Sequence, residues 1–329
     1  MMVMVTGGAG YIGSHAVKRL LADGHEVVIL DNLYRGHRDA IPDGVTLAEL
    51  DLRDTDGIET TLREYRVETV MNFAALAYVG ESVTQPIDYY ENNTAGVLSL
   101  LRAMQRAGVN RMVHSSTCAT YGEPETVPIT EETPQSPINP YGWSKLFVER
   151  MLIDIAQANK NFSFAALRYF NVAGSARDGS IGEDHEPETH LIPVMLLTAL
   201  GQREKMTIFG TDYPTPDGTC IRDYIHVEDL IDAHVTVMNA LAPSDQRFYN
   251  LGIGNGLSVK QLIDAAKKVT GVDFRVDLGP RRPGDPPMLY ADASKIEREL
   301  GWKARITDVH EMIESAWNWF REHPHGYND

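Results

Sequence analysis

Short apolar runs alternate with amphipathic segments along the first half of the chain. The apolar runs predict strands at residues 2–5, 27–30, 46–50, 69–73, 112–114 and 164–168. Apolar residues recur at helical spacing between them, at residues 12–21, 58–65 and 92–107. Because strands that alternate with helices pair in parallel, the pattern predicts an α/β fold, a Rossmann doubly wound parallel sheet with helices on both faces.

The rhythm changes after about residue 170. Residues 173–190 are rich in Gly, Asp and Glu and predict a long loop, and Pro/Gly-rich loops are expected at 210–218 and 279–287. Helical patterns recur at 192–200, 259–269, 294–300 and 309–321. We therefore predict a Rossmann domain over residues 1–175 and a smaller α/β domain over 176–329. The apolar run at 248–251 predicts that a segment near 225–255 rejoins the first sheet.

Composition narrows the choice of partners and of compartment. The 329 residues carry a formal net charge of −16, which argues against nucleic acid or an anionic membrane as a partner. No apolar run approaches the roughly 20 residues needed to span a bilayer, and the apolar start at residues 1–5 is too short for a signal-peptide core. The two cysteines, Cys118 and Cys220, provide no disulfide framework and suit a reducing, cytoplasmic location.

A glycine-rich turn follows the first predicted strand. Gly7 permits a tight turn, Gly10 lets backbone approach a pyrophosphate, and Gly13 lets helix and strand pack closely. The following helix N-terminus offers free N–H groups to phosphate. Asp31 ends the second predicted strand, where a carboxylate accepts ribose hydroxyls and repels a 2′-phosphate, so the pattern favours NAD over NADP. Asp51 ends the third predicted strand and is a candidate for contact with adenine.

A tyrosine and a lysine lie four residues apart on a predicted helix. Tyr141 and Lys145 share one helix face, and Asn139-Pro140 supplies an N-cap and a first helical residue. A nearby ammonium and an oxidised nicotinamide ring both favour phenolate, so Tyr141 is a candidate base for a carbinol proton. Thr117, just past a predicted strand, is a candidate to hold the same substrate oxygen.

These motifs in this order resemble the extended short-chain dehydrogenase/reductases and, within them, the UDP-glucose 4-epimerases. The segments that carry the resemblance begin with Val5-Thr6-Gly7-Gly8-Ala9-Gly10-Tyr11-Ile12-Gly13-Ser14-His15 and Leu30-Asp31-Asn32-Leu33. Further matches are Val79-Gly80-Glu81-Ser82-Val83, Arg168-Tyr169-Phe170-Asn171, Arg222-Asp223-Tyr224-Ile225-His226-Val227 and Arg281-Arg282-Pro283-Gly284-Asp285. The resemblance implies NAD-dependent 4-epimerisation of a UDP-sugar through a 4-keto intermediate, by an enzyme that pairs two helices across a two-fold axis as a homodimer.

The resemblance also implies roles by position. Tyr141 is the base, Lys145 its partner and Thr117 the hydroxyl. Besides the glycines and Asp31, the implied cofactor contacts are Tyr11, Ile12, Asn32, Asp51, Leu52, Phe73, Ala74, Ala75, Asn92, Thr117, Tyr141, Lys145 and Phe170. The implied substrate contacts are Thr117, Tyr141, Asn171, Leu191, Thr207, Phe209, Arg222, Arg282, Asp285 and Leu289. Arg222 and Arg282 would supply the fixed cations that a diphosphate needs on a protein this acidic.

Two positions depart from the family pattern. Ala77 stands where many relatives carry a lysine that touches the cofactor. Leu289 stands where some members have a bulky tyrosine, and its smaller side chain leaves space for a 2-N-acetyl group, so UDP-GlcNAc and UDP-GalNAc are candidate further substrates.

Several alternatives remain at this stage. The segments 75–79 and 115–124 also resemble UDP-arabinose 4-epimerases, whose substrate is a pentose. A 4,6-dehydratase is disfavoured because Cys118-Ala119, not an acidic pair, follows Thr117, and a UDP-glucuronate decarboxylase would need further cations. A non-catalytic dinucleotide sensor is disfavoured because the Thr–Tyr–Lys set is intact.

The remaining histidines and the cysteine beside Thr117 are assigned structural or solvent roles. The sequence shows no recognisable ligand set among His114, His185, His190 and His226, so we predict no metal site. Cys118 is expected to be a buried structural thiol.

Overall fold

The computed structural model describes residues 1–282 and 285–328. Pro283 and Gly284, which belong to one of the resembling segments and to the predicted loop at 279–287, lie outside the described residues, as does Asp329. Within the described residues, no helix is long and apolar enough to cross a membrane.

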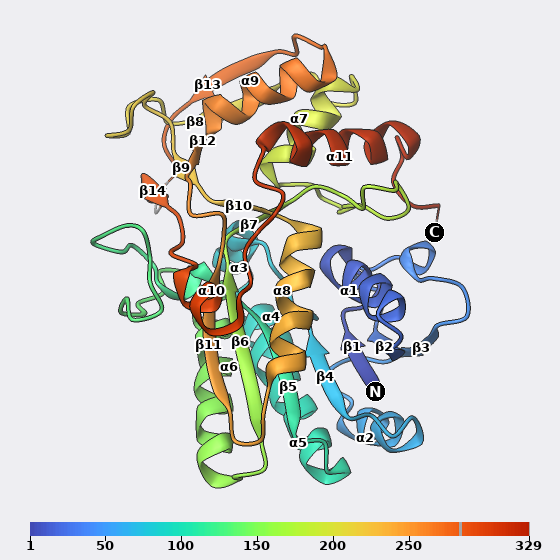
Figure 1. Cartoon of the computed structure of the whole chain (residues 1–329). Coiled ribbons are helices and arrows are strands. Elements are labelled where there is room, and N and C mark those ends of the chain that lie inside the picture. Colours follow the sequence, from blue (N-terminus) through green and yellow to red (C-terminus); the bar gives the residue numbers. More distant parts are fainter. Residues whose placement is uncertain (283–284, 329) are drawn as a thin grey trace.

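A parallel sheet of seven strands dominates the described part of the chain, in the order β11-β6-β5-β4-β1-β2-β3 (Figure 1). The strands are β1 Met2–Thr6, β2 Glu26–Asp31, β3 Thr46–Glu49, β4 Thr69–Asn72, β5 Arg111–Thr117, β6 Ser163–Tyr169 and β11 Gln246–Leu251. The strand order reverses between β1 and β4, and ligands of doubly wound folds bind outside the carboxyl ends of the strands at such a point. The α/β prediction is thus confirmed, including the strand at 248–251 that joins the first sheet.

Both faces of this sheet are covered by helices. The helices around it are α1 Tyr11–Ala22, α2 Thr55–Glu64, α5 Gly96–Ala107, α6 Pro140–Ala158, α8 Val227–Ala240 and α10 Ser294–Leu300. Because side chains alternate along a strand, Val3 and Val5 pack with α1 and α8, whereas Met4 packs with α2, α5 and α6 on the other face. The sequence pattern missed α8, which is buried along most of its length.

The predicted helix at 92–107 has a different start. Residues Tyr90–Ala95 form a π-helical turn that continues into α5. Two short helices, α3 Val79–Thr84 and α4 Pro86–Tyr89, precede it. Asn93 on this turn is buried and bonds the backbone of Leu76 in both directions, so the turn holds the segment that follows β4.

A smaller group of elements lies above the carboxyl edge of the sheet (Figure 1). Its helices are α7 Leu191–Ala199, α9 Val259–Thr270 and α11 Val309–Glu322, which share one apolar cluster. Its short strands are β7 Asn171–Ala173, β8 Met206–Phe209, β9 Ile221–Arg222, β10 Tyr224–His226, β12 Leu257–Ser258, β13 Val276–Gly279 and β14 Met288–Leu289. The helices were predicted, but these strands of two to four residues carry too short a pattern to be recognised.

Candidate active site

The glycine turn between β1 and α1 is packed so closely against backbone atoms that side chains do not fit at Gly7 and Gly13. A Cβ added to Gly13 would lie 2.0 Å from the carbonyl oxygen of Gly7, and one added to Gly7, whose φ is +71°, would lie 2.6 Å from the amide nitrogen of Ala74. Gly10 caps α1 with no side-chain hydrogen bond and no acidic residue in the first turn, so the helix N-terminus remains suited to phosphate. These features fit the pyrophosphate of a dinucleotide.

Replacing Gly13 with alanine is expected to open this turn. The added methyl group meets backbone rather than a flexible side chain, so we expect a loss of about 1–3 kcal/mol of stability and of bound dinucleotide. Thermal unfolding and the nucleotide content of purified protein measure both effects. Gly80→Ala in α3 is the matched control, because nothing lies within 4 Å of its added Cβ. Normal dinucleotide content in Gly13→Ala would contradict the assignment.

Asp31 ends β2 as predicted and faces the glycine turn. Its buried carboxylate accepts hydrogen bonds from the backbone of Ala9 at 3.0 Å and of Leu33 at 2.9 Å. Burial raises the pKa of this carboxyl, and the two backbone donors oppose that effect. Asp51 lies two residues beyond β3 rather than at its end. It accepts from Asn32 and Arg53, and Arg53 lowers the pKa of Asp51 to about 2.

The other predicted cofactor residues lie on elements that meet at the carboxyl edge of the seven-stranded sheet. Tyr11 and Ile12 begin α1, and the Tyr11 hydroxyl donates to the carbonyl of Gly174 at 2.5 Å. Phe73 and Ala74 follow β4 and donate backbone hydrogen bonds to the carbonyl of Thr6. The rest are placed on the segment after β4 (Ala75), after β3 (Leu52), on the π-helical turn (Asn92) and between β6 and β7 (Phe170).

The predicted catalytic residues come from β5 and α6. Thr117 is the last residue of β5, and its hydroxyl accepts from the amide of Ala119 at 3.2 Å. The side chain of Asn139 caps α6 through the amide of Gly142 at 2.9 Å, with Pro140 as the first helical residue, as predicted. Lys145, one turn beyond Tyr141, is buried and donates to the carbonyl of Ser115 at 2.9 Å. The capped helix thus directs Tyr141 and Lys145 at the end of β5.

The protein alone does not lower the pKa of Tyr141. Burial raises the pKa of its phenol above the usual value, and a hydrogen bond with Thr117 opposes this to a smaller extent. Burial also lowers the pKa of Lys145 to about 7. The expected activation combines Lys145 with an oxidised nicotinamide ring, and without that ring desolvation dominates the pKa of both groups. Activation needs a further positive charge at the site.

An apolar cluster joins the end of β5 to the predicted sugar pocket. Phe170 and Leu289 pack with Tyr121 and with Cys118, the neighbour of Thr117. Burial of the sulfur raises the pKa of the Cys118 thiol to about 12, which disfavours the reactive thiolate, although the residue is partly buried and not fully buried as expected. Leu289 of β14 pairs in register with Arg222 of β9. One short sheet therefore carries both the wall of the sugar pocket and a predicted phosphate-binding arginine.

Two arginines mark the predicted UDP end. Arg222 forms an ion pair with Asp285, and the guanidinium of Arg282 stacks on the ring of Phe209 at 4.0 Å. Arg282 and Asp285 line a cavity of about 750 Å³ together with Tyr213 and Met288. A cation over an aromatic face beside a polar cavity suits a nucleobase with phosphates.

Three predicted substrate residues lie nearby on other elements. Asn171 in β7 donates its amide to the carbonyl of Asp223 at 3.0 Å, beside Arg222. Thr207 lies two residues before Phe209 in β8, hence on the same face, and Leu191 begins α7. Among the described residues, no hydrogen bond or ion pair links Leu191 or Thr207 to the arginines.

Sequence reasoning missed a buried ion pair that joins α6 to the sheet. Glu149 on α6 accepts two hydrogen bonds from the guanidinium of Arg168 on β6, at 2.9 and 2.6 Å. It also accepts from Ser116 on β5 at 2.6 Å. Both charged side chains are nearly fully buried. The family motif contains Arg168, but nothing in the spacing signals its partner.

The departure at position 77 remains. Ala77 is exposed and carries no charge. Arg35 contacts the residues that follow Ala77: its guanidinium stacks on the ring of Tyr78 at 4.9 Å and forms an ion pair with Glu81.

The four histidines that the sequence assigned to structural or solvent roles separate into two pairs in the structure. His114 and His226 are buried structural residues, bonded to Asn72 and Ser315. His185 and His190, however, converge with Glu183 and Glu188, so that one potential ligand atom from each of the four lies within 4.8 Å of the others. The sequence argument overlooked this set because it considered histidines without the glutamates between them.

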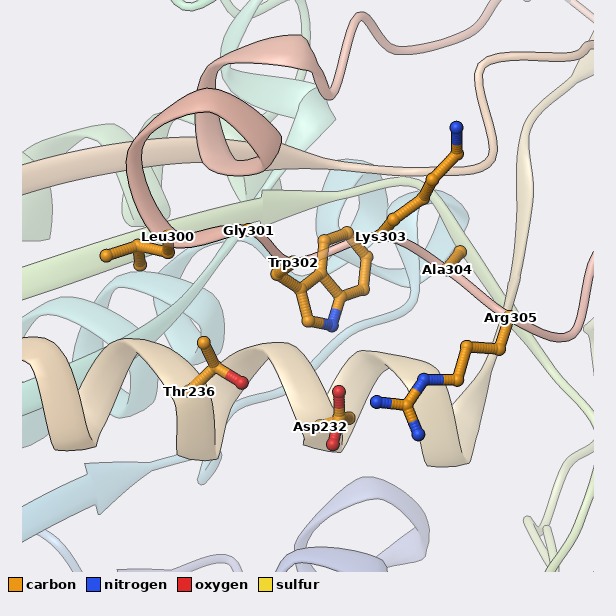
Figure 2. Close-up of a pocket in the computed structure, with 8 residues that line it drawn as sticks. All are labelled: Asp232, Thr236, Leu300, Gly301, Trp302, Lys303, Ala304 and Arg305. Carbon is orange, nitrogen blue, oxygen red and sulfur yellow. The ribbon is translucent and has the colours of Figure 1, made fainter.

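A second cavity, of about 310 Å³, lies away from these residues. It is bounded by α8 and by the segment after α10, with Trp302 between Thr236 and Ala304 (Figure 2). It contains none of the predicted cofactor, catalytic or substrate residues, so it is not the candidate active site.

Comparisons with known proteins agree with this geometry. The model of the NAD dependent epimerase/dehydratase family matches residues 3–252. A UDP-glucose 4-epimerase of Lactobacillus helveticus is 48% identical, with both chains covered in full. A crystal structure of a UDP-glucose 4-epimerase superposes with a TM-score of 0.97 at 49% identity, again covering both chains in full. The structure of the Bifidobacterium longum UDP-glucose 4-epimerase in complex with NAD+ and UDP has a TM-score of 0.95 at 40% identity, covering 99% of this chain and 100% of that one.

Proposed function

Since the chain belongs to the NAD dependent epimerase/dehydratase family, we propose that it is an isomerase that interconverts UDP-glucose and UDP-galactose at C4 of the sugar. The observation that carries this proposal is the meeting of Thr117, Tyr141 and Lys145 at the carboxyl end of β5, beside the glycine turn. Full-length similarity to UDP-glucose 4-epimerases supports it.

NAD would bind across the point where the strand order reverses. Gly7, Gly10 and Gly13 would hold the pyrophosphate at the start of α1, and Asp31 would accept the ribose hydroxyls of the adenosine. The further cofactor contacts would be Tyr11, Ile12, Asn32, Asp51, Leu52, Phe73, Ala74, Ala75, Asn92, Thr117, Tyr141, Lys145 and Phe170. Support comes from the B. longum relative, which was solved with NAD+.

The protein's part in the reaction is a proton transfer at a held oxygen. Bound NAD would accept hydride from C4 and return it to the resulting 4-keto sugar. Tyr141 Oη would take the proton of the 4-hydroxyl and later give it back, while Thr117 Oγ1 holds the same oxygen. The positive charge of an oxidised nicotinamide, added to that of Lys145, would oppose the burial that raises the pKa of Tyr141.

Inversion at C4 requires the sugar to turn over while UDP stays bound. The polar anchors therefore belong at the UDP end, and they are Asn171, Thr207, Arg222, Arg282 and Asp285. Leu191 and Phe209 would add apolar contacts there. The sugar end is bounded by Phe170 and Leu289, which offer apolar contact and no hydrogen bonds that fix one orientation. This division matches a reaction in which both epimers must fit.

The size of Leu289 bears on the choice of sugar. A leucine at this wall leaves room for a 2-N-acetyl group, so we expect UDP-GlcNAc and UDP-GalNAc to be accepted as well. A UDP-pentose such as UDP-arabinose is the alternative. The hexose is favoured because the relatives described above are UDP-glucose 4-epimerases.

A homodimer would cover the apolar side of α6. Trp143 and Phe147 are 38% and 43% exposed and pack on each other, and Leu98 of α5 is 44% exposed. Helix pairing across a two-fold axis would bury them.

We also propose a cytoplasmic location, and a domain division into residues 1–175 and 176–329 with a segment near 225–255 returning to the first domain.

The direct test is incubation of purified protein with UDP-galactose, without added cofactor, followed by chromatography of the nucleotide sugars. We expect UDP-glucose to appear, because NAD that is regenerated in each cycle need not exchange. The same assay with UDP-GlcNAc tests the prediction from Leu289. Absence of any product, even with NAD supplied, would contradict the proposal and direct attention to UDP-pentoses.

A further inference from the structure

The long loop between β7 and α7 holds a compact group of two histidines and two glutamates. Glu183, His185, Glu188 and His190 follow the spacing Glu-x-His-x-x-Glu-x-His. This is the group that, among residues 1–282 and 285–328, offers three or more metal-ligand side chains together. We propose that these four side chains bind one divalent cation, Zn²⁺, which fixes the loop rather than taking part in the epimerisation.

The distances within the group suit tetrahedral coordination. His185 Nδ1 lies 3.3 Å from a carboxylate oxygen of Glu183 and 3.5 Å from one of Glu188. His190 Nδ1 lies 3.6 Å from the other carboxylate oxygen of Glu188. Ligand atoms on a tetrahedral zinc with bonds of about 2.0–2.1 Å are about 3.3–3.4 Å apart. The 2.6 Å contact between His190 and Glu183 would widen by about 0.7 Å on coordination, and the four ligand atoms, which lie within 4.8 Å of one another, would move to equal spacing.

One nitrogen in the group lacks a hydrogen bond. His185 Nδ1 is buried and makes no hydrogen bond to any described residue, although two carboxylates lie close to it. Glu183 and Glu188 are only 4% and 8% exposed. Buried carboxylates need a cationic partner, and a buried nitrogen that faces two carboxylates without a hydrogen bond to either is placed to bind a cation with them. Two carboxylates and two neutral imidazoles balance the charge of one Zn²⁺.

A proton is the competing occupant. Burial lowers the pKa of His185, but Glu183 and Glu188 outweigh this effect and raise it to about 10. A cluster of ion pairs without metal would therefore also satisfy the charges, and the experiment has to separate the two states. Imidazole and carboxylate together suit zinc better than magnesium or calcium, which prefer oxygen ligands alone.

Surrounding groups orient the ligands and show what the cation would secure. The amide of His190 donates to Glu188 Oε1 at 2.6 Å, and Arg203 donates to the carbonyl of Glu188 at 2.7 Å. Such outer contacts are typical of metal ligands. The ring of His185 packs edge-on against Tyr11, which begins α1, and against Tyr78. In Figure 1 this loop passes between α11 and α1. Zinc would thus hold the loop in contact with Tyr11, which follows the proposed cofactor-binding turn.

The test uses untagged full-length protein, stripped with a chelator and titrated with ZnCl₂ against a chromophoric competitor. We expect one Zn²⁺ per chain, a higher thermal midpoint with zinc, and the intense visible absorption of four-coordinate cobalt when Co²⁺ replaces it. Glu183→Gln and His185→Gln should each weaken zinc binding by at least about tenfold to 100-fold. His310→Gln, from the exposed His310–Asp308 pair on α11, is the matched control and should bind normally.

Three results would overturn the proposal: no stoichiometric zinc, a weak octahedral cobalt spectrum, or unchanged affinity in both variants. The wild-type cobalt spectrum needs no variant to fold, and far-ultraviolet circular dichroism checks the variants. None of these readouts depends on epimerase activity, so the zinc site and the proposed function fail or stand separately.

Discussion

Tyr141→Phe is expected to lower the turnover of UDP-galactose by about 10²–10⁴-fold, the usual contribution of a positioned acid–base group. The substitution removes one oxygen, and the ring keeps its edge-on packing against Tyr89 at 6.3 Å. The phenol is the proton acceptor in reach of the oxygen that Thr117 would hold, and burial limits replacement by water. Retained NAD and thermal stability should therefore match the wild type.

The comparison needs a tyrosine whose hydroxyl has no role at the site. Tyr65 at the end of α2 packs against the core beneath the sheet, and Tyr65→Phe should leave turnover unchanged. Turnover is measured by chromatography of UDP-glucose, and bound NAD by release on denaturation. Full activity in Tyr141→Phe would exclude the proposed base, whereas a dinucleotide sensor would show no turnover in either protein.

The parts of this molecule that the sequence predicted are those encoded over a few adjacent residues. Gly7, Gly10 and Gly13 specify their turn because each lacks a Cβ that backbone atoms would meet. Asn139 and Pro140 start α6, and the helical repeat then places Lys145 one turn from Tyr141. Such local rules predicted the large sheet, most of the helices and the placement of the candidate catalytic residues. The assignment of UDP contacts came instead from family resemblance.

What the sequence did not predict depends on contacts between distant segments. Helix α8 escaped notice because it is buried on several sides and lacks a clear amphipathic pattern. The convergence of Glu183 with His190 depends on the path of an irregular loop, which no periodicity describes. The sign of the pKa shift at Tyr141 likewise depends on burial, which is a property of the assembled fold.

The buried pair of Glu149 and Arg168 is the strongest case of such a distant contact, and Glu149→Gln is expected to destabilise the protein by about 3–5 kcal/mol. The glutamate accepts from Arg168 twice, from Ser116, and from Gln135 at 3.0 Å. An amide in its place offers one oxygen and brings N–H groups toward the guanidinium. The arginine charge would then be buried without its carboxylate partner, with only the hydroxyl of Tyr121 and the carbonyl of Glu131 to accept its hydrogen bonds.

The loss should come from the unpaired charge and not from the missing glutamate itself. In a Glu149→Leu, Arg168→Met double variant both charges are gone, so most of the stability should return, whereas either single change should cost it. Asp154→Asn on the same helix is the control: its exposed pair with Arg150 should contribute below about 0.5 kcal/mol. Denaturant unfolding of the wild type and of each of these variants measures the differences. Because Ser116 precedes Thr117 and Glu149 lies on the helix of Tyr141, the double variant should also show whether the ion pair aligns the two. A stable double variant with reduced turnover would assign Glu149 and Arg168 a positioning role, and one with normal turnover would restrict the pair to stability.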